Sequence, residues 1–168
     1  MTLRFVAARP NFSSMRNKLL GVLFCMHGVF AWAQDSTFST TVGMAVLCLD
    51  DVEPGFFYNY MSNIKRAYKR EQGAYWFKTP GQLFGAPVTE VFVSDGSSPY
   101  LFVGIVSSLP PVELAAAVAA SAPAGGSFKS VNPADKFASF ISPAGSEIVY
   151  QGKNGKMFCR RDRIRPPD

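Results

Sequence analysis

The hydrophobic pattern begins with one long apolar run near the N-terminus. Residues 19–33 form a 15-residue stretch without a charged side chain, which ends in Ala31-Trp32-Ala33. Basic residues precede it, at Arg4, Arg9, Arg16 and Lys18. A basic segment, a short apolar run and an A-x-A site are typical of a secretory signal peptide, and the run is shorter than the ~20 residues of a spanning helix. We predict a signal peptide over residues 1–33, starting at Met1 or Met15, and no membrane span after its cleavage.

After this run, the pattern predicts a polar leader, a strand and a helix. Residues 34–41 are polar, and residues 42–49 are an almost continuous apolar run of strand length. Apolar side chains then recur three and four positions apart between Phe57 and Tyr68, which favours a helix that Pro54 begins. Its expected end is basic and complements the helix dipole, with Lys65, Arg66, Lys69 and Arg70.

Shorter segments separated by Gly, Pro and Asn predict a sheet and a second helix. We expect the helix over residues 112–122 and a hairpin turn at Lys153-Asn154-Gly155. The expected strands are residues 74–78, 88–94, 100–106, 137–141, 147–151 and 156–160. The fold class is therefore α+β, an antiparallel sheet with two helices packed on one face. Short matches 60 to 63 positions apart suggest a tandem β-α-β-β pseudo-repeat with halves 42–95 and 100–160, and chance similarity accounts for them equally well.

Composition indicates a single mature domain over residues 34–168. The chain is 48% hydrophobic and 17% charged, values typical of a globular protein. Its net charge of +5 comes largely from the predicted signal peptide, because 13 basic and 12 acidic residues remain after residue 33. The high charge is thus a mark of export, and we expect no nucleic-acid partner.

Two cysteines remain after the predicted cleavage, Cys48 and Cys159. In an oxidising compartment a disulfide between them is the expected state, and two buried free thiols are the alternative. The bridge would tie the first predicted strand to the last.

The mature chain lacks the residues of several common chemistries. It contains no histidine, so Ser-His and Cys-His pairs, histidine bases and most zinc sites are excluded. It also has no G-x-S-x-G, P-loop or dinucleotide-binding motif, and we expect no cofactor or metal. A mechanism with two carboxylates is still compatible with the sequence. The candidate acids are Asp50, Asp51, Glu53, Glu90 and Glu147, for which helix capping and solvated strand faces are the structural alternatives.

Candidate binding residues are apolar side chains near chain breaks and the basic groups. Leu83 and Phe84 lie in a loop with Gly85 and Pro87, Tyr100 follows a turn, and Trp76 or both of its neighbours must face away from the helices. The basic candidates are Lys65, Arg66, Lys69 and Arg70, which the disulfide would bring near a second group, Arg160, Arg161, Arg163 and Arg165.

These features favour an exported, non-enzymatic protein-binding module of the inhibitor or immunity-protein type. We expect it to be periplasmic or secreted and to bind another protein of the cell envelope. The alternatives are a carboxylate-dependent hydrolase of cell-wall glycans, and an envelope accessory or assembly protein that uses the basic groups.

Overall fold

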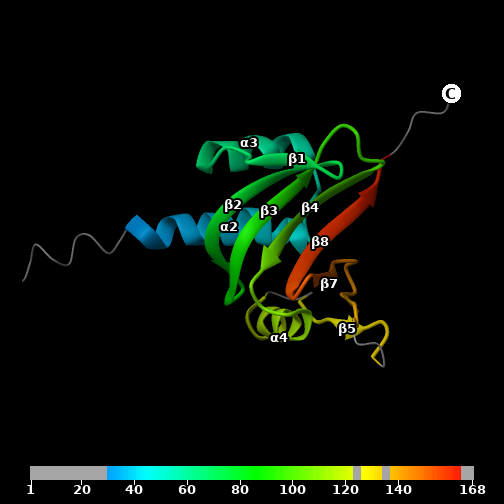
Figure 1. Cartoon of the computed structure of the whole chain (residues 1–168). Helices are drawn as coiled ribbons and strands as arrows, with labels where there is room; N and C mark the ends of the chain where they lie inside the picture. The colour runs from blue at the N-terminus through cyan, green and yellow to red at the C-terminus, as the bar shows by residue number, and fades with distance from the viewer. Residues whose placement is uncertain (1–29, 123–125, 134–136, 164–168) are drawn as a thin grey trace, which may run out of the picture. The chain divides into compact units, whose positions relative to one another are not determined.

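An antiparallel sheet and a set of helices make up the described part of the protein (Figure 1). The structure is a computed structural model that describes residues 30–122, 126–133 and 137–163. Residues 35–168 form one compact unit with the whole sheet, and residues 1–34 form another, of which only the start of α2 is described. The helices are α2 (Phe30–Val46), α3 (Pro54–Ile64) and α4 (Pro111–Ser121). The strands are β1 (Lys69–Glu71), β2 (Ala74–Leu83), β3 (Ala86–Ser94), β4 (Tyr100–Ser107), β5 (Lys129–Ser130), β6 (Phe140–Ile141), β7 (Glu147–Gln151) and β8 (Asn154–Asp162).

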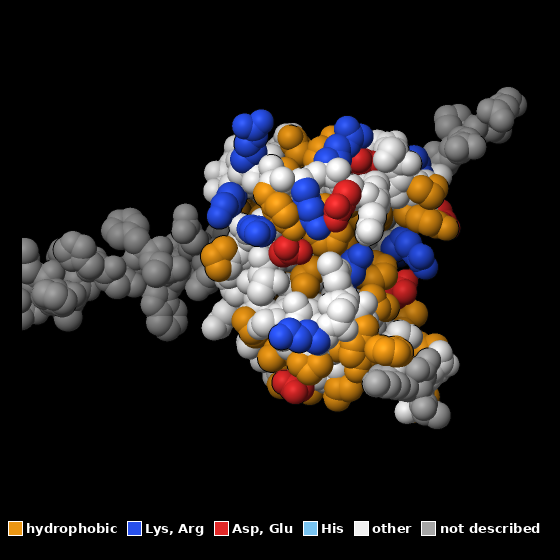
Figure 2. Space-filling model, in the orientation of Figure 1, with side chains coloured by type: hydrophobic (Ala, Val, Ile, Leu, Met, Phe, Trp, Pro, Cys, Tyr) orange, Lys and Arg blue, Asp and Glu red, His pale blue; other side chains and the backbone are white. Residues whose placement is uncertain are grey.

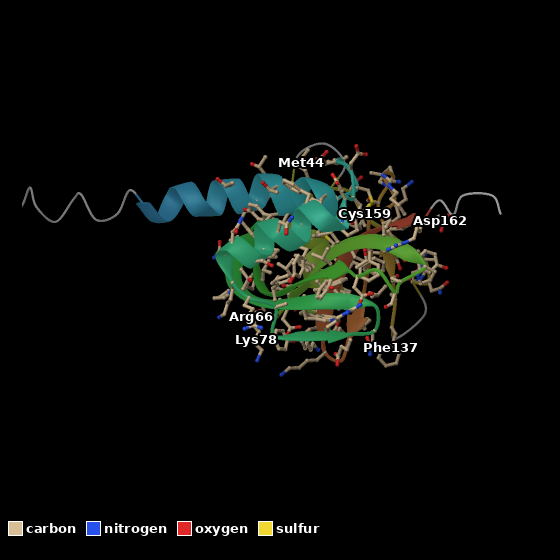
Figure 3. The ribbon with its side chains drawn as sticks, turned by 90° about the horizontal axis from the view of Figure 1, so that it is seen from above. Met44, Arg66, Lys78, Phe137, Cys159 and Asp162 are labelled. Carbon is tan, nitrogen blue, oxygen red and sulfur yellow. A yellow bond between two sulfur atoms is a disulfide. The ribbon has the colours of Figure 1, made fainter. Side chains whose placement is uncertain are left out.

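The eight strands lie in the order β1-β2-β3-β4-β8-β7-β6-β5, and every described pair is antiparallel. One face of the sheet, which we call the inner face, shares its core with residues of all three described helices. Figure 3 shows α2 and α3 on the same side of the strands. The predicted α+β class and the placement of helices on one face are confirmed, and the structure adds a third helix.

Residues 42–46 belong to helix α2, so the predicted strand over residues 42–49 is wrong, as is the polar leader over residues 34–41. Phe38, Val42, Ala45 and Val46 are buried at helical spacing against the inner face. The helix ends in a Schellman motif, in which the N–H of Cys48 donates to the Ala45 carbonyl and the N–H of Leu49 to the Met44 carbonyl. Cys48 takes the left-handed position at φ 59°.

The predicted long basic helix end is also wrong, because α3 stops at Ile64. Lys69 and Arg70 lie in β1, which pairs with β2 through a two-residue turn at Gln72 and Gly73, both with positive φ. The start of α3 matches the prediction, with Pro54 in its first turn. Glu53 occupies the N-cap position, but its side chain makes no capping hydrogen bond.

The hairpins follow the predicted strands with shifted turns. Strand β2 continues beyond the expected strand over residues 74–78, with an irregularity between Lys78 and Gly81, and a tight turn at Phe84 and Gly85 joins it to β3. The last hairpin turns at Gly152 and Lys153, so Asn154 and Gly155 lie in β8 rather than in the predicted turn. Of the expected strand over residues 137–141, only Phe140–Ile141 is a strand.

The predicted disulfide is confirmed. Cys48 and Cys159 are bonded across a sequence separation of 111, with their Cα atoms 5.2 Å apart. Because residues 42–46 are helical, the bridge ties the end of α2 to the inner face of β8, instead of joining two strands.

Two other expectations concern the ends and the halves of the chain. The predicted signal peptide lies mostly outside the described residues, and its cleavage bond, Ala33–Gln34, falls inside α2. No described helix has the length and apolar character needed to cross a membrane.

The tandem repeat is not shown, because its first half starts with a helix where the repeat requires a strand.

Candidate functional site

The second face of the sheet, the outer face, carries its own hydrophobic cluster. Ala74, Trp76, Phe92 and Val106 are buried there, and Phe102 and Phe158 pack against them, so every member comes from a strand. We call the four aromatic rings, Trp76, Phe92, Phe102 and Phe158, the outer aromatic layer. The strand register explains it, since Trp76 pairs with Phe92, Phe92 with Gly104, and Gly104 with Phe158 across four neighbouring strands.

Gly104 leaves the space that the layer fills. A Cβ atom at this position would overlap the Phe92 ring and lie 2.6 Å from the Phe158 Cβ and 2.7 Å from the Met157 carbonyl oxygen. The rings of Phe92 and Phe158, with centroids 6.4 Å apart, therefore meet over a glycine. Trp76 stacks on Phe92 from the other side, with centroids 4.9 Å apart.

Lysine side chains cover this layer, and Lys156 is the central one. Its Nζ atom lies 4.4 Å from the Phe92 ring centroid, 5.5 Å from that of Trp76 and 5.6 Å from that of Phe158. Lys69 also lies over Trp76, with Nζ 4.4 Å from the ring centroid. Burial lowers the pKa of Lys156 below its usual value, because a desolvated ammonium group is less favourable than a neutral amine.

Most of the other charges on the outer face are paired. Lys69 pairs with Glu71 at 2.5 Å, and Arg160 pairs with Glu147 at 3.3 Å. Among the described residues, Lys156 has no ion-pair partner. Figure 2 shows this side of the molecule, with lysine and arginine side chains spread among hydrophobic ones. The outer face thus presents cations above aromatic rings, and its most buried ammonium group has no carboxylate counterion.

The candidate acids are not brought together. Glu90 accepts a hydrogen bond from the Tyr68 hydroxyl at 2.7 Å, and Glu147 pairs with Arg160. Glu90 is on β3 and Glu147 on β7, three strand steps apart in the sheet order. With strands about 4.8 Å apart, this places them roughly 14 Å from each other, beyond the ~5 to 9.5 Å of glycosidase carboxylate pairs.

Asp50, Asp51 and Glu53 are exposed between α2 and α3, and the Asp51 backbone N–H donates to the Asp50 side chain at 2.8 Å. The described residues contain no group of three or more His, Cys, Asp or Glu side chains placed to hold a metal ion.

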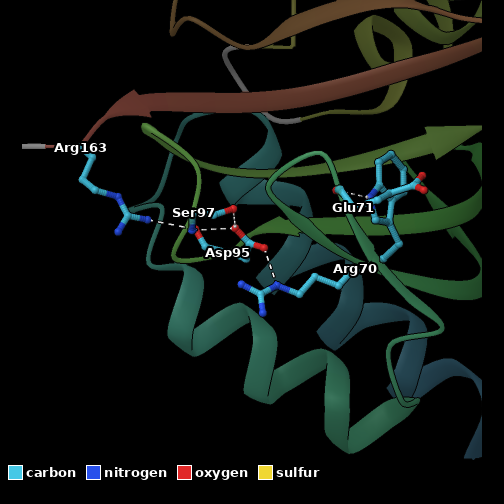
Figure 4. A network of polar contacts seen from close by, with 6 residues as sticks. Arg70, Glu71, Asp95, Ser97 and Arg163 are labelled. Carbon is cyan, nitrogen blue, oxygen red and sulfur yellow. Dashed lines mark hydrogen bonds and ion pairs between the residues drawn. The ribbon is translucent and has the colours of Figure 1, made fainter.

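Asp95 connects the two predicted basic groups at one end of the sheet (Figure 4). Arg70 Nε lies 2.6 Å from Asp95 Oδ2, and the Arg163 guanidinium donates to the Asp95 backbone carbonyl at 3.1 Å. Both the N–H and the hydroxyl of Ser97 donate to Asp95 Oδ1, at 2.8 and 2.6 Å. The two basic groups, which were expected to lie near each other, are therefore connected through a shared acid, whose side chain is only 3% exposed.

Burial raises the pKa of the Asp95 carboxyl, but the hydrogen bonds from Ser97 and the ion pair with Arg70 outweigh it and lower the pKa from 3.8 to about 2. The ionised form therefore stabilises the fold above the unfolded pKa, and that contribution is lost as the pH falls through the folded value. We expect Asp95→Asn to lower the free energy of unfolding at pH 7 by about 1 to 2 kcal/mol, since solvent around Arg70 screens part of the pair.

Urea titrations of both proteins between pH 7 and pH 2 check this expectation. The difference between wild type and variant should shrink as the pH falls from about 4 towards 2. A difference that stays constant over this range would show that the carboxyl charge has no such role.

An open groove of about 400 Å³ lies beside Asp95. Tyr58 and Tyr75 contribute adjacent rings to it, with centroids 4.5 Å apart and ring planes tilted by 53°. The remaining lining residues come from the first half of α3, the end of β3 and the turn after it, β4 and the residue after β8: Pro54, Gly55, Asn59, Ser94, Asp95, Gly96, Leu101 and Arg163.

The predicted apolar binding residues have different positions in the structure. Leu83 is fully buried, so it is not available to a partner. Phe84 is partly buried on the inner core, where its ring lies against Gly43 of α2, and it does not project from a free loop as expected. Trp76 faces away from the helices, which is one of the two alternatives that the strand alternation allowed. It lies beneath lysine side chains and is only 2% exposed. Tyr100 is 39% exposed, at the start of β4.

The four predicted basic residues do not form one helical face. Lys65 and Arg66 are exposed after the end of α3, whereas Lys69 lies over Trp76 on the outer face. Arg70 points the other way, towards Asp95 and the Tyr75 ring. Sequence reasoning missed Lys156, because the only signal for it is its place two residues before Phe158 on a strand. The two other rings above which it lies, Trp76 and Phe92, come from other strands.

Comparisons with family models, with curated proteins and with solved structures found no match to this chain.

Proposed function

We propose that this protein is an exported binding module of the cell envelope whose outer sheet face binds an acidic surface of another protein. The observation that carries the proposal is the outer aromatic layer, a cluster whose described members all come from strands and over which lysine side chains lie. Aromatic residues are enriched where proteins bind one another, and a positive surface favours a partner whose facing surface is negative. The Cys48–Cys159 bridge suits an oxidising compartment.

Lys156 defines the chemistry of the expected partner. Its ammonium group is desolvated over three rings and lacks a counterion among the described residues. A carboxylate from a partner would restore the lost electrostatic stabilisation, and closing the interface would exclude more water and strengthen that pair. We therefore place the inhibitor-like contact on this face, and no longer on the loop around Phe84.

A substitution at Lys156 tests the proposal without removing the aromatic layer. Lys156→Met keeps an apolar stem over the rings, and we expect its stability to stay within about 1 kcal/mol of wild type, because lost cation–π attraction and relieved desolvation oppose each other. The exposed Lys153, in the β7–β8 turn, provides the matched control Lys153→Met.

The measurement is quantitative affinity isolation from envelope extract under non-reducing conditions. We expect a protein with an acidic surface to be retained by wild type and by Lys153→Met, and to be at least tenfold depleted with Lys156→Met. Equal retention by all three proteins would rule out the outer face as the binding surface.

A further inference from the structure

The corner between α3 and β1 combines exposed apolar side chains with cations. Ile64, at the end of α3, is 51% exposed, and Tyr68 is 42% exposed. Lys78 lies with its Nζ 5.0 Å from the Tyr68 ring centroid, and Figure 3 shows Arg66 and Lys78 at the same end of the molecule. We define the α3–β1 corner by six residues: Ile64, Lys65, Arg66, Tyr68, Lys69 and Lys78.

The corner has an excess of positive charge. Its four cations stand against two carboxylates, so the excess is two charges. Glu71 pairs with Lys69 at 2.5 Å, and Glu90, which lies opposite Lys78 in the strand register, accepts a hydrogen bond from the Tyr68 hydroxyl. Lys65, Arg66 and Lys78 form no ion pair with the residues that the structure describes. The acidic residues Asp50, Asp51 and Glu53 precede the opposite end of α3, about 16 Å away at 1.5 Å per helical residue.

We propose that the α3–β1 corner docks the protein on an anionic lipid surface. Each lysine or arginine near such a surface strengthens binding roughly fivefold, and the ring of Tyr68 is of the type found at the level of lipid headgroups. Ile64 distinguishes lipid from a soluble polyanion, because only a membrane offers an apolar layer that its exposed side chain enters. The corner borders the outer aromatic layer and shares Lys69 with it, but it does not include Lys156, and substitutions at Ile64, Lys65 and Arg66 leave both lysines over the rings in place.

Flotation with vesicles tests this proposal directly. The protein as recovered from producing cells is mixed with vesicles of 30% phosphatidylglycerol in phosphatidylcholine, or of phosphatidylcholine alone. We expect Lys65→Glu/Arg66→Glu to lower the partition coefficient on anionic vesicles at least tenfold, and Ile64→Ser to lower it several-fold. Every variant has the same N-terminus, so differences between variants report on the corner alone.

Matched controls use exposed residues elsewhere. Lys129→Glu/Lys153→Glu makes the same charge change, and Val112→Ser removes a side chain that is 56% exposed on α4. Both controls, and Lys156→Met, should partition like wild type, and none of the differences should appear on phosphatidylcholine alone.

Two results would overturn the proposal. One is equal partitioning of wild type and the corner variants on anionic vesicles. The other is a combined result: Lys65→Glu/Arg66→Glu weakens binding to soluble polyphosphate as much as binding to anionic vesicles, and Ile64→Ser changes neither. That result would assign the corner to a soluble polyanion. Neither result bears on the binding of a protein at Lys156, which is measured separately.

Discussion

Removing the Cys48–Cys159 bridge is expected to lower the free energy of unfolding by about 4 to 5 kcal/mol, a large part of the stability of a single domain. The bridge closes a loop of 111 positions, so its loss releases much conformational freedom in the unfolded chain. It also fixes the end of α2, where Cys48 has a left-handed backbone that glycine usually occupies. Urea unfolding of Cys48→Ala/Cys159→Ala measures the change.

The reduced wild-type protein distinguishes the effect of losing the bond from the effect of losing the cysteine side chains. It keeps both buried sulfur atoms, so it should unfold close to the double variant if loop closure is the main contribution. The stabilising role of the bridge would be contradicted if the free energies of unfolding of oxidised wild type and the double variant differed by less than about 1 kcal/mol.

Gly104→Ala is expected to destabilise the protein by about 3 kcal/mol, although it adds a single methyl group. The new Cβ would overlap the Phe92 ring and lie 2.7 Å from the Met157 carbonyl oxygen, which is backbone and cannot rotate away. The variant would have to displace β8 or expel the Phe92 ring from the outer aromatic layer. Thermal unfolding and the near-ultraviolet circular dichroism of Trp76, which stacks on Phe92, measure both effects.

Gly96→Ala is the matched control for this change. Gly96 lies in the turn after β3, and a Cβ there would have nothing within 4 Å. Its expected effect is below about 0.5 kcal/mol. If Gly104→Ala were equally neutral, the close packing of the aromatic rings over β4 would be wrong.

The disulfide and the fold class were predictable because they depend on few facts. Two cysteines remain after the predicted signal peptide, which leaves one pairing, and alternating apolar strands between turn residues indicate an antiparallel sheet. The run over residues 42–49 was not predictable in the same way. A short, continuous apolar run fits a buried strand and a buried helix equally well, and only packing of Val42 and Val46 on the sheet decides between them.

The Asn154-Gly155 pair failed as a turn signal for a different reason. A Cβ at Gly155 would lie 2.8 Å from Leu114 Cδ2 and 3.0 Å from the Leu109 carbonyl oxygen. The glycine therefore permits α4 and the chain before it to approach β8, and the turn moves to Gly152. A glycine needed for close packing has the same sequence signature as one needed for a turn.

The candidate site was the least predictable part. The outer aromatic layer depends on the register that pairs Trp76, Phe92, Gly104 and Phe158 across β2, β3, β4 and β8. Residues on one strand show only that alternate side chains share a face. The order of strands, which places β8 beside β4, is what brings Lys156 above rings from three strands.

Site-specific photocross-linking in producing cells tests the central claim most directly, that the outer face binds a protein. A photoreactive phenylalanine derivative replaces Tyr100, which is 39% exposed on β4 beside Arg160, or Val112, which is 56% exposed on α4. We predict a discrete cross-linked protein with an acidic surface from position 100, none from position 112, and loss of the position-100 product in the Lys156→Met background. Cross-links from position 112 alone, or a position-100 product that Lys156→Met leaves unchanged, would contradict the claim.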